Sequence, residues 1–504
     1  MELNLSHENI RINESVYDGT LEQSIEQDYS LPDYYPGIFK VLKTTITPCV
    51  YNCRTSGDKL VVDGVIFVDI LYLGEENNQL HSIQQKYPFS KTADIKGECN
   101  TPIICYSTSG DYINCRVINP RRVDLRGAIT IQIKVYCPKE EMVLSDAEGN
   151  GIQLNRGSIH TGSSHLWGTK QFSAEEQFTL EPPAEEIISY YASAVAGECK
   201  LIANKMVTKG DIILHVIYRI SDENQQLQTA TKTIPISQIL DLPGVDEDYS
   251  CNVCYFVTGV DLHKEEDSNM INAQFDLTLC GDAYIQKDIA CVTDAFSTLY
   301  ESQTVTKEIA TDRLIRILDD SMVSKQQVEL QNIQQVIDVW GKVRNLSAKS
   351  MEDHLDFTGE LEADILAVDS ENNPVFLTKE IPIEFQLSSD QLCEIPIVQT
   401  KGDIVNMEYS FNGTILDLEA EIKLCGTVSC RDWIRIVTDF SIDETAPKET
   451  KNRPALTIYY ADGGESLWDI ARHYNTSMDA IMEENAMERP IIEERRMMLI
   501  PIVE

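Results

Sequence analysis

Hydrophobic and polar residues alternate with the period of a β-strand over most of this chain. In residues 59–73, Val65, Phe67 and Leu71 alternate with Ile66 and Val68, so both faces of the run are largely apolar. Such a run is typical of a central strand that is buried on two sides. Residues 417–424 alternate polar and apolar positions more cleanly, which predicts a strand with one exposed face. The pattern predicts a mainly β protein.

This strand-rich pattern occurs three times. A glycine followed by a run rich in β-branched residues recurs roughly 150 residues apart, and a proline inside a second apolar run follows it at a similar offset each time. A Leu-x-Gly sequence is the third marker of each copy. The markers are Gly64, Gly210 and Gly359; Pro88, Pro235 and Pro382; and Gly127, Gly281 and Gly426. The period is far longer than the roughly 20–50 residues of a solenoid, so it indicates domain duplication.

We predict that each copy is a β-sandwich-like domain with one short helix, and we place the copies at residues 1–150, 171–305 and 306–442. The helices are expected at residues 36–43, 184–192 and 333–342, since Ile38, Val41 and Leu42 have the spacing of one helical face. Residues 138–170 are polar and glycine-rich, which predicts a long loop. Residues 443–454 are charged and contain two prolines, which predicts a flexible linker.

Residues 455–504 follow a different pattern and predict a small C-terminal βααβ domain. A strand at 457–461 leads into a capping box, Ser466-x-x-Asp469, and a second box, Thr476-x-x-Asp479, opens another helix. Asn485 can end the second helix, and a returning strand ends at a proline. The first helix places Leu467, Ile470, Ala471 and Tyr474 on one apolar face.

Charge and cysteine content restrict the partners and the compartment. The net charge is −39, from 81 acidic and 42 basic residues, and such a surface repels nucleic acid and anionic membranes, although acidity also keeps a large protein soluble. The first 19 residues lack the features of a signal peptide, and no run approaches the roughly 18 apolar residues of a membrane span. We therefore expect a cytoplasmic protein without membrane insertion, whose 14 cysteines are reduced thiols.

The C-terminal pattern resembles the LysM domain. The residues that carry the resemblance are Gly464-Glu465-Ser466-Leu467-Trp468, Ile470-Ala471, Tyr474-Asn475, Asn485 and Ile500-Pro501. In LysM domains, the loop after the first strand and the loop before the last strand form a groove for N-acetylated sugars. Members of the family usually carry a glycine-glutamine pair before the last strand, where this chain has Arg495 and Arg496. The departure argues against glycan binding.

The three copies resemble the SPOCS-type domain of spore-envelope proteins. The first copy carries Leu31-Pro32-Asp33-Tyr34-Tyr35-Pro36-Gly37-Ile38, and all three carry the glycine-strand segment. Tandem copies followed by a LysM domain are similar to the SipL family of sporulation morphogenesis proteins. The resemblance implies a mother-cell protein that localises to the forespore surface and spore coat. It also implies binding to the stage IV sporulation protein A ATPase through the LysM domain, with other coat proteins as further partners.

We select eight candidate partner-binding residues in the C-terminal domain: Gly464, Leu467, Trp468, Asn485, Met487, Arg495, Arg496 and Met497. Five of the 12 methionines lie in this domain, and methionine suits surfaces that repack onto a protein. Met478, Met482 and Met498 are expected in the core, which leaves Met487 and Met497 for the surface. Trp468 is either an interface residue or packed against the strands beneath it. The arginines either pair with acidic groups of a partner or balance charge within the domain.

The sequence lacks the common catalytic and cofactor motifs, including the phosphate-binding loop and the His-Glu-x-x-His helix. We therefore expect no enzymatic activity and no cofactor. Cys251-x-x-Cys254 has metal-like spacing but no second pair at a zinc-ribbon distance, so no metal site is expected. Two alternatives remain open: binding to spore cortex peptidoglycan, and an enzyme with an acidic pocket at the 138–170 loop that is lined by several copies.

Overall fold

The alternating segments fold as long antiparallel strands, which pair within three similar units. The computed structural model describes residues 3–75, 78–220, 226–265, 268–351, 353–388, 393, 396–448 and 456–501. Unit 1 comprises β1 (Asn4–Ser30), β2 (Ile38–Ser56), β3 (Lys59–Gly74), β4 (Leu80–Asp94), β5 (Ile103–Asn119) and β6 (Arg122–Glu148). Its strands form two sheets, in the orders β1-β6-β5 and β2-β3-β4. The mainly β prediction is therefore confirmed.

Units 2 and 3 repeat this topology. Unit 2 comprises β7 (Ile152–Thr179), β8 (Ala184–Ile202), β9 (Lys205–Ile220), β10 (Leu227–Asp241), β11 (Ser250–Lys264) and β12 (Met270–Ser297). Unit 3 comprises β13 (Tyr300–Glu329), β14 (Ile333–Ser350), β15 (His354–Asp369), β16 (Pro374–Ser388), β17 (Pro396–Phe411) and β18 (Ile415–Pro447). Their sheets have the same order as those of unit 1. The repeated glycine segment is the central strand of a sheet in every unit: β3, β9 and β15.

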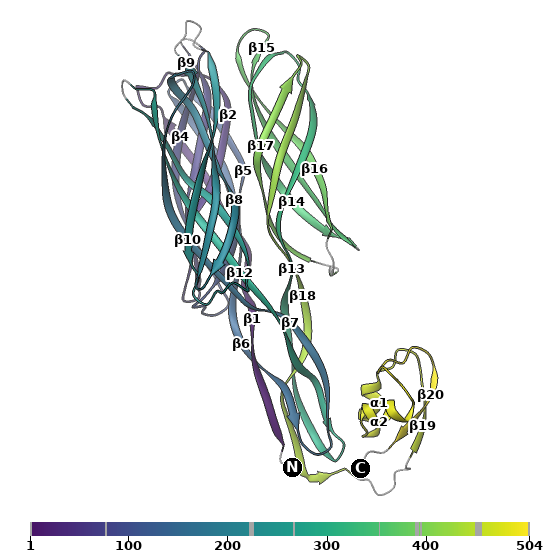
Figure 1. The fold of residues 1–504 in the computed structure, drawn as a ribbon. Helices are drawn as coiled ribbons and strands as arrows, with labels where there is room; N and C mark the ends of the chain where they lie inside the picture. Colours follow the sequence, from purple (N-terminus) through teal and green to yellow (C-terminus); the bar gives the residue numbers. More distant parts are fainter. Residues whose placement is uncertain are drawn as a thin grey trace.

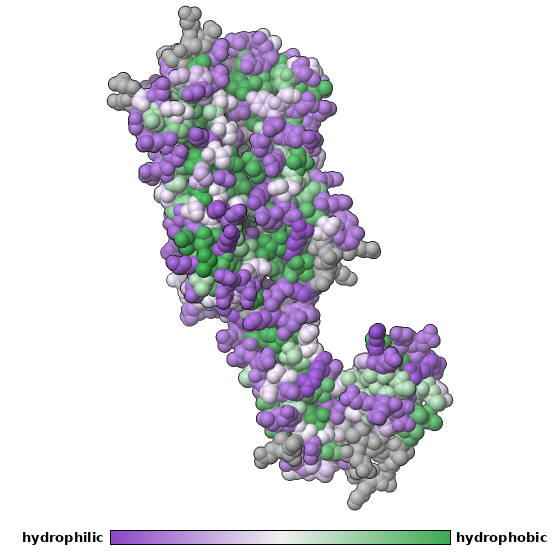
Figure 2. Space-filling view, in the orientation of Figure 1, coloured by the Kyte–Doolittle hydropathy of each residue, from purple (hydrophilic) through white to green (hydrophobic). Residues whose placement is uncertain are grey.

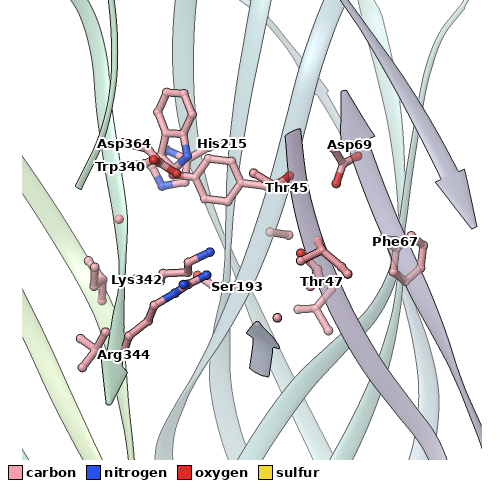
Figure 3. Close-up of a pocket in the computed structure, with 18 of the residues that line it drawn as sticks. Thr45, Thr47, Phe67, Asp69, Ser193, His215, Trp340, Lys342, Arg344 and Asp364 are labelled. Atoms are coloured by element: carbon pink, nitrogen blue, oxygen red, sulfur yellow. The ribbon is translucent and has the colours of Figure 1, made fainter. Parts of the chain in front are cut away.

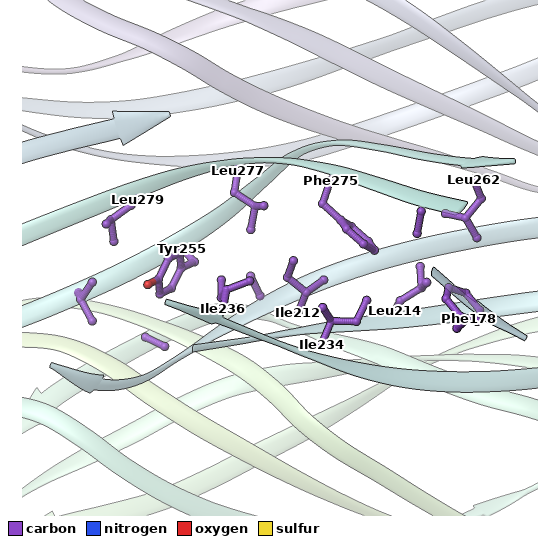
Figure 4. Packing of buried hydrophobic residues seen from close by; sticks show 14 of the residues in the cluster. Phe178, Ile212, Leu214, Ile234, Ile236, Tyr255, Leu262, Phe275, Leu277 and Leu279 are labelled. Atoms are coloured by element: carbon purple, nitrogen blue, oxygen red, sulfur yellow. The ribbon is translucent and has the colours of Figure 1, made fainter. Parts of the chain in front are cut away.

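Each unit has its own hydrophobic core between its two sheets. In unit 2, Ile212 and Leu214 of β9 belong to one cluster with Phe275 and Leu277 of β12 and with Tyr255 of β11 (Figure 4). The central-strand glycines permit close packing in this layer. A Cβ atom on Gly210 would lie 2.6 Å from the carbonyl oxygen of Val195 on the neighbouring strand. Their recurrence in the sequence therefore has a steric cause.

The predicted short helices are wrong. Residues 36–43, 184–192 and 333–342 mostly lie in β2, β8 and β14, each of which has two register shifts near its start. In β2 these shifts fall between Ile38 and Lys40 and between Val41 and Lys43. A β-bulge inserts one extra residue, so buried positions recur at intervals of three instead of two. Two closely spaced bulges thus imitated the periodicity of a helix.

The predicted 138–170 loop is also wrong. It is occupied by the end of β6, a turn at residues 149–151 and the first part of β7. Two of the glycines that suggested a loop, Gly149 and Gly151, lie in this turn, whereas Gly168 lies within β7, where its Cβ atom would lie 2.8 Å from a methyl group of Leu242. Residues 443–447 of the predicted linker continue β18, while 449–454 lie outside the described residues.

The two longest strands of each unit continue beyond the sandwiches and form a common stem (Figure 1). Equivalent residues of the three units meet inside it: Ile10, Ile159 and Ile309 share a core with Val143, Cys291 and Ile436. A second layer lies nearer the tip and contains Leu144, Val292 and Val437. At the other end, the sandwiches contact one another through Leu71, Ile188 and Leu366. The three units therefore form one body with approximate threefold equivalence.

The expectation that all cysteines are reduced is contradicted by two disulfides, Cys99–Cys137 and Cys393–Cys430. Both lie where the sandwich meets the stem, and Cys137 and Cys430 occupy equivalent positions beside the register shift of the first long strand. The register places Lys287 at this position in unit 2. Ten other cysteines are unbonded. The matching positions in units 1 and 3 are consistent with a structural crosslink.

Candidate partner-binding site on the C-terminal module

The C-terminal module has the predicted βααβ order: β19 (Leu456–Ala461), α1 (Leu467–Tyr474), α2 (Met478–Glu484) and β20 (Arg496–Pro501). The Asp469 amide donates to Ser466 Oγ at 3.3 Å, which confirms the first cap. The second cap is one residue later than predicted, because the Ala480 amide donates to Ser477 Oγ at 3.1 Å. Thr476 is buried instead of capping the helix.

Two of the candidate residues hold the module together. Leu467 lies in its core with Ile470, Ala471 and Ile481. Asn485 caps α2 and joins it to β20: its side-chain amide donates to the carbonyl oxygen of Leu499 at 2.6 Å, and its Oδ1 accepts from the Leu499 amide at 2.7 Å. These bonds occupy the Asn485 side chain, so we assign it a structural role.

Gly464, Arg495 and Arg496 lie where the resemblance places a sugar-binding groove. Gly464 has a φ of +88°, and its amide donates to the Ile492 carbonyl oxygen at 2.7 Å, so the loop after β19 touches the loop before β20. Arg495 Nε lies 3.3 Å from Asp462 Oδ1, joining the same two loops. Both side chains are largely exposed, and such a pair contributes at most about 1 kcal/mol. Arg496 is exposed and donates to the Asn485 carbonyl oxygen at 3.3 Å.

The methionines divide between core and surface. Met498 is buried, and Met478 and Met482 pack against the core as expected. Met487, predicted at the surface, is half-buried and packs against the same core. Met497 is 51% exposed. Of the two surface candidates, Met497 alone presents most of its side chain to solvent.

Trp468 is buried against the stem. Its ring lies 4.9 Å from that of Phe296 in β12, in an edge-on arrangement. The indole Nε1 donates to Asp294 Oδ2 at 2.9 Å, and an Arg472 guanidinium nitrogen lies 2.5 Å from the same oxygen. Trp468 is 7% exposed. Trp468 therefore attaches the module to the stem through its contacts with Phe296 and Asp294.

Lys448 makes a second connection between the stem and the module. Its ammonium donates to the carbonyl oxygen of Ser297 at 2.9 Å and to Asn475 Oδ1 at 2.8 Å. Its backbone amide donates to the carbonyl oxygen of Leu299 at 2.8 Å. Because Asn475 caps α1, this lysine places the end of α1 beside the stem tip.

Asp294, which accepts the hydrogen bond from Trp468, was not among the residues selected from the sequence. Asp294 has counterparts in Asp146 and Asp439, and each of the three directly follows a register shift in the last strand of its unit. Each carboxylate accepts from the next backbone amide at 2.9 Å. Asp146 also pairs with Arg156, whereas Asp294 is the one bonded to the module. The recurring Ser/Thr-Asp pair was the sequence signal that could have identified this position.

A cavity of about 1100 Å³ lies between the three sandwiches. Lys342 and Arg344 extend from β14 toward Ser193 on the opposite wall (Figure 3). Charges on the walls are paired, as in the contacts of Lys43 with Asp364 and of Lys401 with Asp403. The cavity is lined by all three units but by no residue of 138–170, and its charges are mixed. It differs in place and charge from the acidic pocket that the enzyme alternative required.

The described residues offer neither a metal-binding cluster nor a helix suited to a membrane. These residues contain no group of three or more histidine, cysteine or acidic side chains placed to hold a metal ion. Cys251 lies within hydrogen-bonding distance of Cys199, and burial raises the pKa of Cys254, whose thiol therefore stays protonated. No helix in the described part of the chain is long and apolar enough to cross a membrane.

Comparison with known families gives matches in two parts of the chain. Residues 37–118 and 183–265 match the SipL, SPOCS domain, and residues 463–501 match the LysM domain. The SPOCS matches cover β2–β5 of unit 1 and the equivalent β8–β11 of unit 2. Neither the curated proteins nor the solved structures gave a match. These domains suggest a sporulation protein, and the LysM domain suggests peptidoglycan binding.

Proposed function

We propose that this SipL-like chain, with its SPOCS and C-terminal LysM domains, is a non-enzymatic sporulation scaffold that captures a protein partner. The partner we propose is the stage IV sporulation protein A ATPase, bound through the LysM domain at the forespore surface. There the complex would help the coat encase the forespore, together with other coat proteins.

The observation that carries this proposal is the attachment of the LysM domain to the stem. Three units share a stem core, and the Trp468–Asp294 contact fixes the module at its tip. The SPOCS units thus form a long platform with a single binding module at one end (Figure 1). A module held in one orientation loses less freedom when it binds, which favours capture of a partner.

The test is a binding assay with the purified ATPase, using the full chain and a chain that lacks residues 455–504. The remaining units keep their own hydrophobic cores, so we expect the shortened chain to fold. We expect the full chain to retain the ATPase and the shortened chain to lose it. Equal retention by both chains would contradict the proposal. A fluorescent fusion should form a ring at the forespore, and a diffuse signal would argue against that location.

The LysM match favours peptidoglycan binding as a second candidate function. The Arg495–Asp462 pair crosses the groove, but both side chains are exposed, so a sugar could displace the pair at a cost of at most about 1 kcal/mol. Co-sedimentation of the full chain with purified peptidoglycan tests this function. If Arg495 only blocks the groove, Arg495→Gly will increase sedimentation. If the module binds protein alone, neither the full chain nor the Arg495→Gly variant will sediment with peptidoglycan.

A further inference from the structure

Unit 2 differs from the other two units where the sandwich meets the stem. Units 1 and 3 each have a disulfide there, Cys99–Cys137 and Cys393–Cys430. No disulfide occurs among the described residues of unit 2, although this unit also contains cysteines. Two of its unbonded cysteines, Cys199 and Cys251, lie at the same level of the molecule.

Cys199 and Cys251 belong to the two different sheets of unit 2. Cys199 lies in β8, in the sheet β10-β9-β8, and Cys251 lies in β11, in the sheet β11-β12-β7. Cys251 pairs with Ala283 of β12, close to the register shift that follows Ile285. The disulfides of units 1 and 3 lie beside the corresponding shifts of their own long strands. Cys251 is therefore at the junction of sandwich and stem.

Cys199 is at this junction too, as a comparison with unit 1 shows. Cys53 and Cys199 occupy equivalent positions, because each is opposite the fourth residue of the central strand of its sheet. Thr55 follows Cys53 closely in β2, and its hydroxyl donates to the carbonyl oxygen of Cys99 at 2.9 Å. A bond between Cys199 and Cys251 would therefore join the two sheets of unit 2 at the end where units 1 and 3 are crosslinked.

The two thiols contact each other. Both side chains pack against the core of unit 2, and the Cys199 thiol donates a hydrogen bond to the Cys251 sulfur. This hydrogen bond lowers the pKa of Cys251 and raises the pKa of Cys199, because it stabilises a thiolate on Cys251. A thiolate beside a second thiol is the arrangement from which a disulfide forms.

Small molecules can reach this pair. Cys199 and Cys251 are each half-buried, whereas other cysteines, such as Cys291 and Cys425, are buried. The LysM domain lies beside the stem and leaves the end of the sandwiches uncovered on the face that Figure 2 shows. A metal ion fits the pair less well, since the described residues contain no group of three ligand side chains placed to hold one.

We propose that Cys199 and Cys251 are a redox-active pair that reacts with a small-molecule disulfide to form a third disulfide of the chain. The Cys251 thiolate attacks one sulfur of the small disulfide, whose other half leaves as a thiolate. Cys199 then loses its proton to solvent and attacks the Cys251 sulfur, which breaks the mixed disulfide and releases the second thiolate. The protein loses two electrons and two protons, and the small disulfide becomes two thiols.

The test treats the purified full-length chain with oxidised glutathione, blocks the remaining thiols with a maleimide and maps the linked peptides by mass spectrometry. We expect a peptide pair joined through Cys199 and Cys251. Cys199→Ser should instead keep glutathione on Cys251, because no second thiol resolves the mixed disulfide. Cys251→Ser should take up glutathione at residue 199 at least about tenfold more slowly, because the attacking thiolate is gone.

Cys53→Ser is the matched control, since Cys53 occupies the position of Cys199 in unit 1 and is also half-buried. This variant should form the Cys199–Cys251 link as the parent does. Free thiols or separate glutathione adducts at both positions after exhaustive treatment of the parent would refute the proposal, and so would a link from Cys251 to Cys254. Equal rates of glutathione uptake by Cys199→Ser and Cys251→Ser would overturn the assignment of Cys251 as the attacking thiol.

Discussion

Replacement of Asp294 by alanine should release the LysM domain from the stem. The Asp294 carboxylate accepts hydrogen bonds from the Trp468 indole at 2.9 Å and from the Arg472 guanidinium at 2.5 Å. Its side chain is 19% exposed, so water screens these contacts only in part. Alanine leaves both donors without their acceptor, and the indole N–H would then be buried against Phe296 without a partner.

The expected effect can be estimated from these two bonds. A hydrogen bond to a charged group contributes about 1.5–3 kcal/mol, and two bonds to one carboxylate are not fully additive. We therefore expect a loss of about 3 kcal/mol in the free energy of attachment. That loss corresponds to roughly a hundredfold lower ratio of attached to detached module. The Phe296–Trp468 ring contact, worth about 1 kcal/mol, remains and opposes full release.

Hydrogen exchange of the α1 amides and small-angle scattering will measure the release. Asp439→Ala is the matched control, because Asp439 follows the same register shift and makes the same 2.9 Å bond to its next amide but is not bonded to the module. We expect faster exchange in α1 and a broader distribution of dimensions for Asp294→Ala alone. Identical exchange in the two variants would refute the assignment of Asp294 as the attachment residue.

Three further predictions concern the units. Cys99→Ser and Cys393→Ser should each lower the free energy of unfolding by about 4 kcal/mol, since each disulfide closes a loop of nearly 40 residues, and denaturant titrations with and without reductant will measure it. Burial raises the pKa of Asp338 to about 6, so the folded state holds this proton more tightly than the unfolded state and stability falls as pH rises from about 4 to 6. Asp338→Asn should therefore stabilise the protein by about 3 kcal/mol at pH 7.5 and by little at pH 4, as melting curves at both pH values will show. Gly210→Ala should cost about 1–3 kcal/mol because its Cβ would lie 2.6 Å from a backbone oxygen, while Gly359→Ala, whose nearest neighbour is a leucine methyl group at 3.2 Å, should cost less in the same melting assay.

The sequence predicted the repetition and the strand content because these depend on local pattern. Alternation marked β3 and β18 correctly. At Gly64 and Gly210 a Cβ atom would lie 2.6 Å from a backbone oxygen of the neighbouring strand, which explains why glycine recurs there. Prediction from the sequence failed where a β-bulge changed the spacing of the buried residues along a strand. The paired register shifts in β2, β8 and β14 set apolar residues three apart, a spacing shared with helices.

The candidate site was predicted in part for a similar reason. The capping pattern and the apolar face placed α1, and Met497 was correctly expected at the surface. The partner of Trp468 lies 174 residues earlier in the chain, and no local pattern reports such a distance. The exposure of Ile458 and Tyr460 in β19 was missed because both are ordinary strand residues in sequence. They become distinctive only when the stem is known to cover the opposite side of the module.

The three stem aspartates show how one LysM domain attaches to a stem built from three similar units. All three follow a register shift and accept a hydrogen bond from the next backbone amide, so they share one local conformation near the stem tip. Asp146 is engaged by Arg156 of the neighbouring strand, and Asp294 by the LysM domain. Among the described residues the LysM domain contacts Asp294 of unit 2, so its attachment makes unit 2 differ from units 1 and 3 at this position. If the LysM domain is the partner site, as proposed, each chain contributes that site once through this module, and multivalency through it requires several chains assembled together.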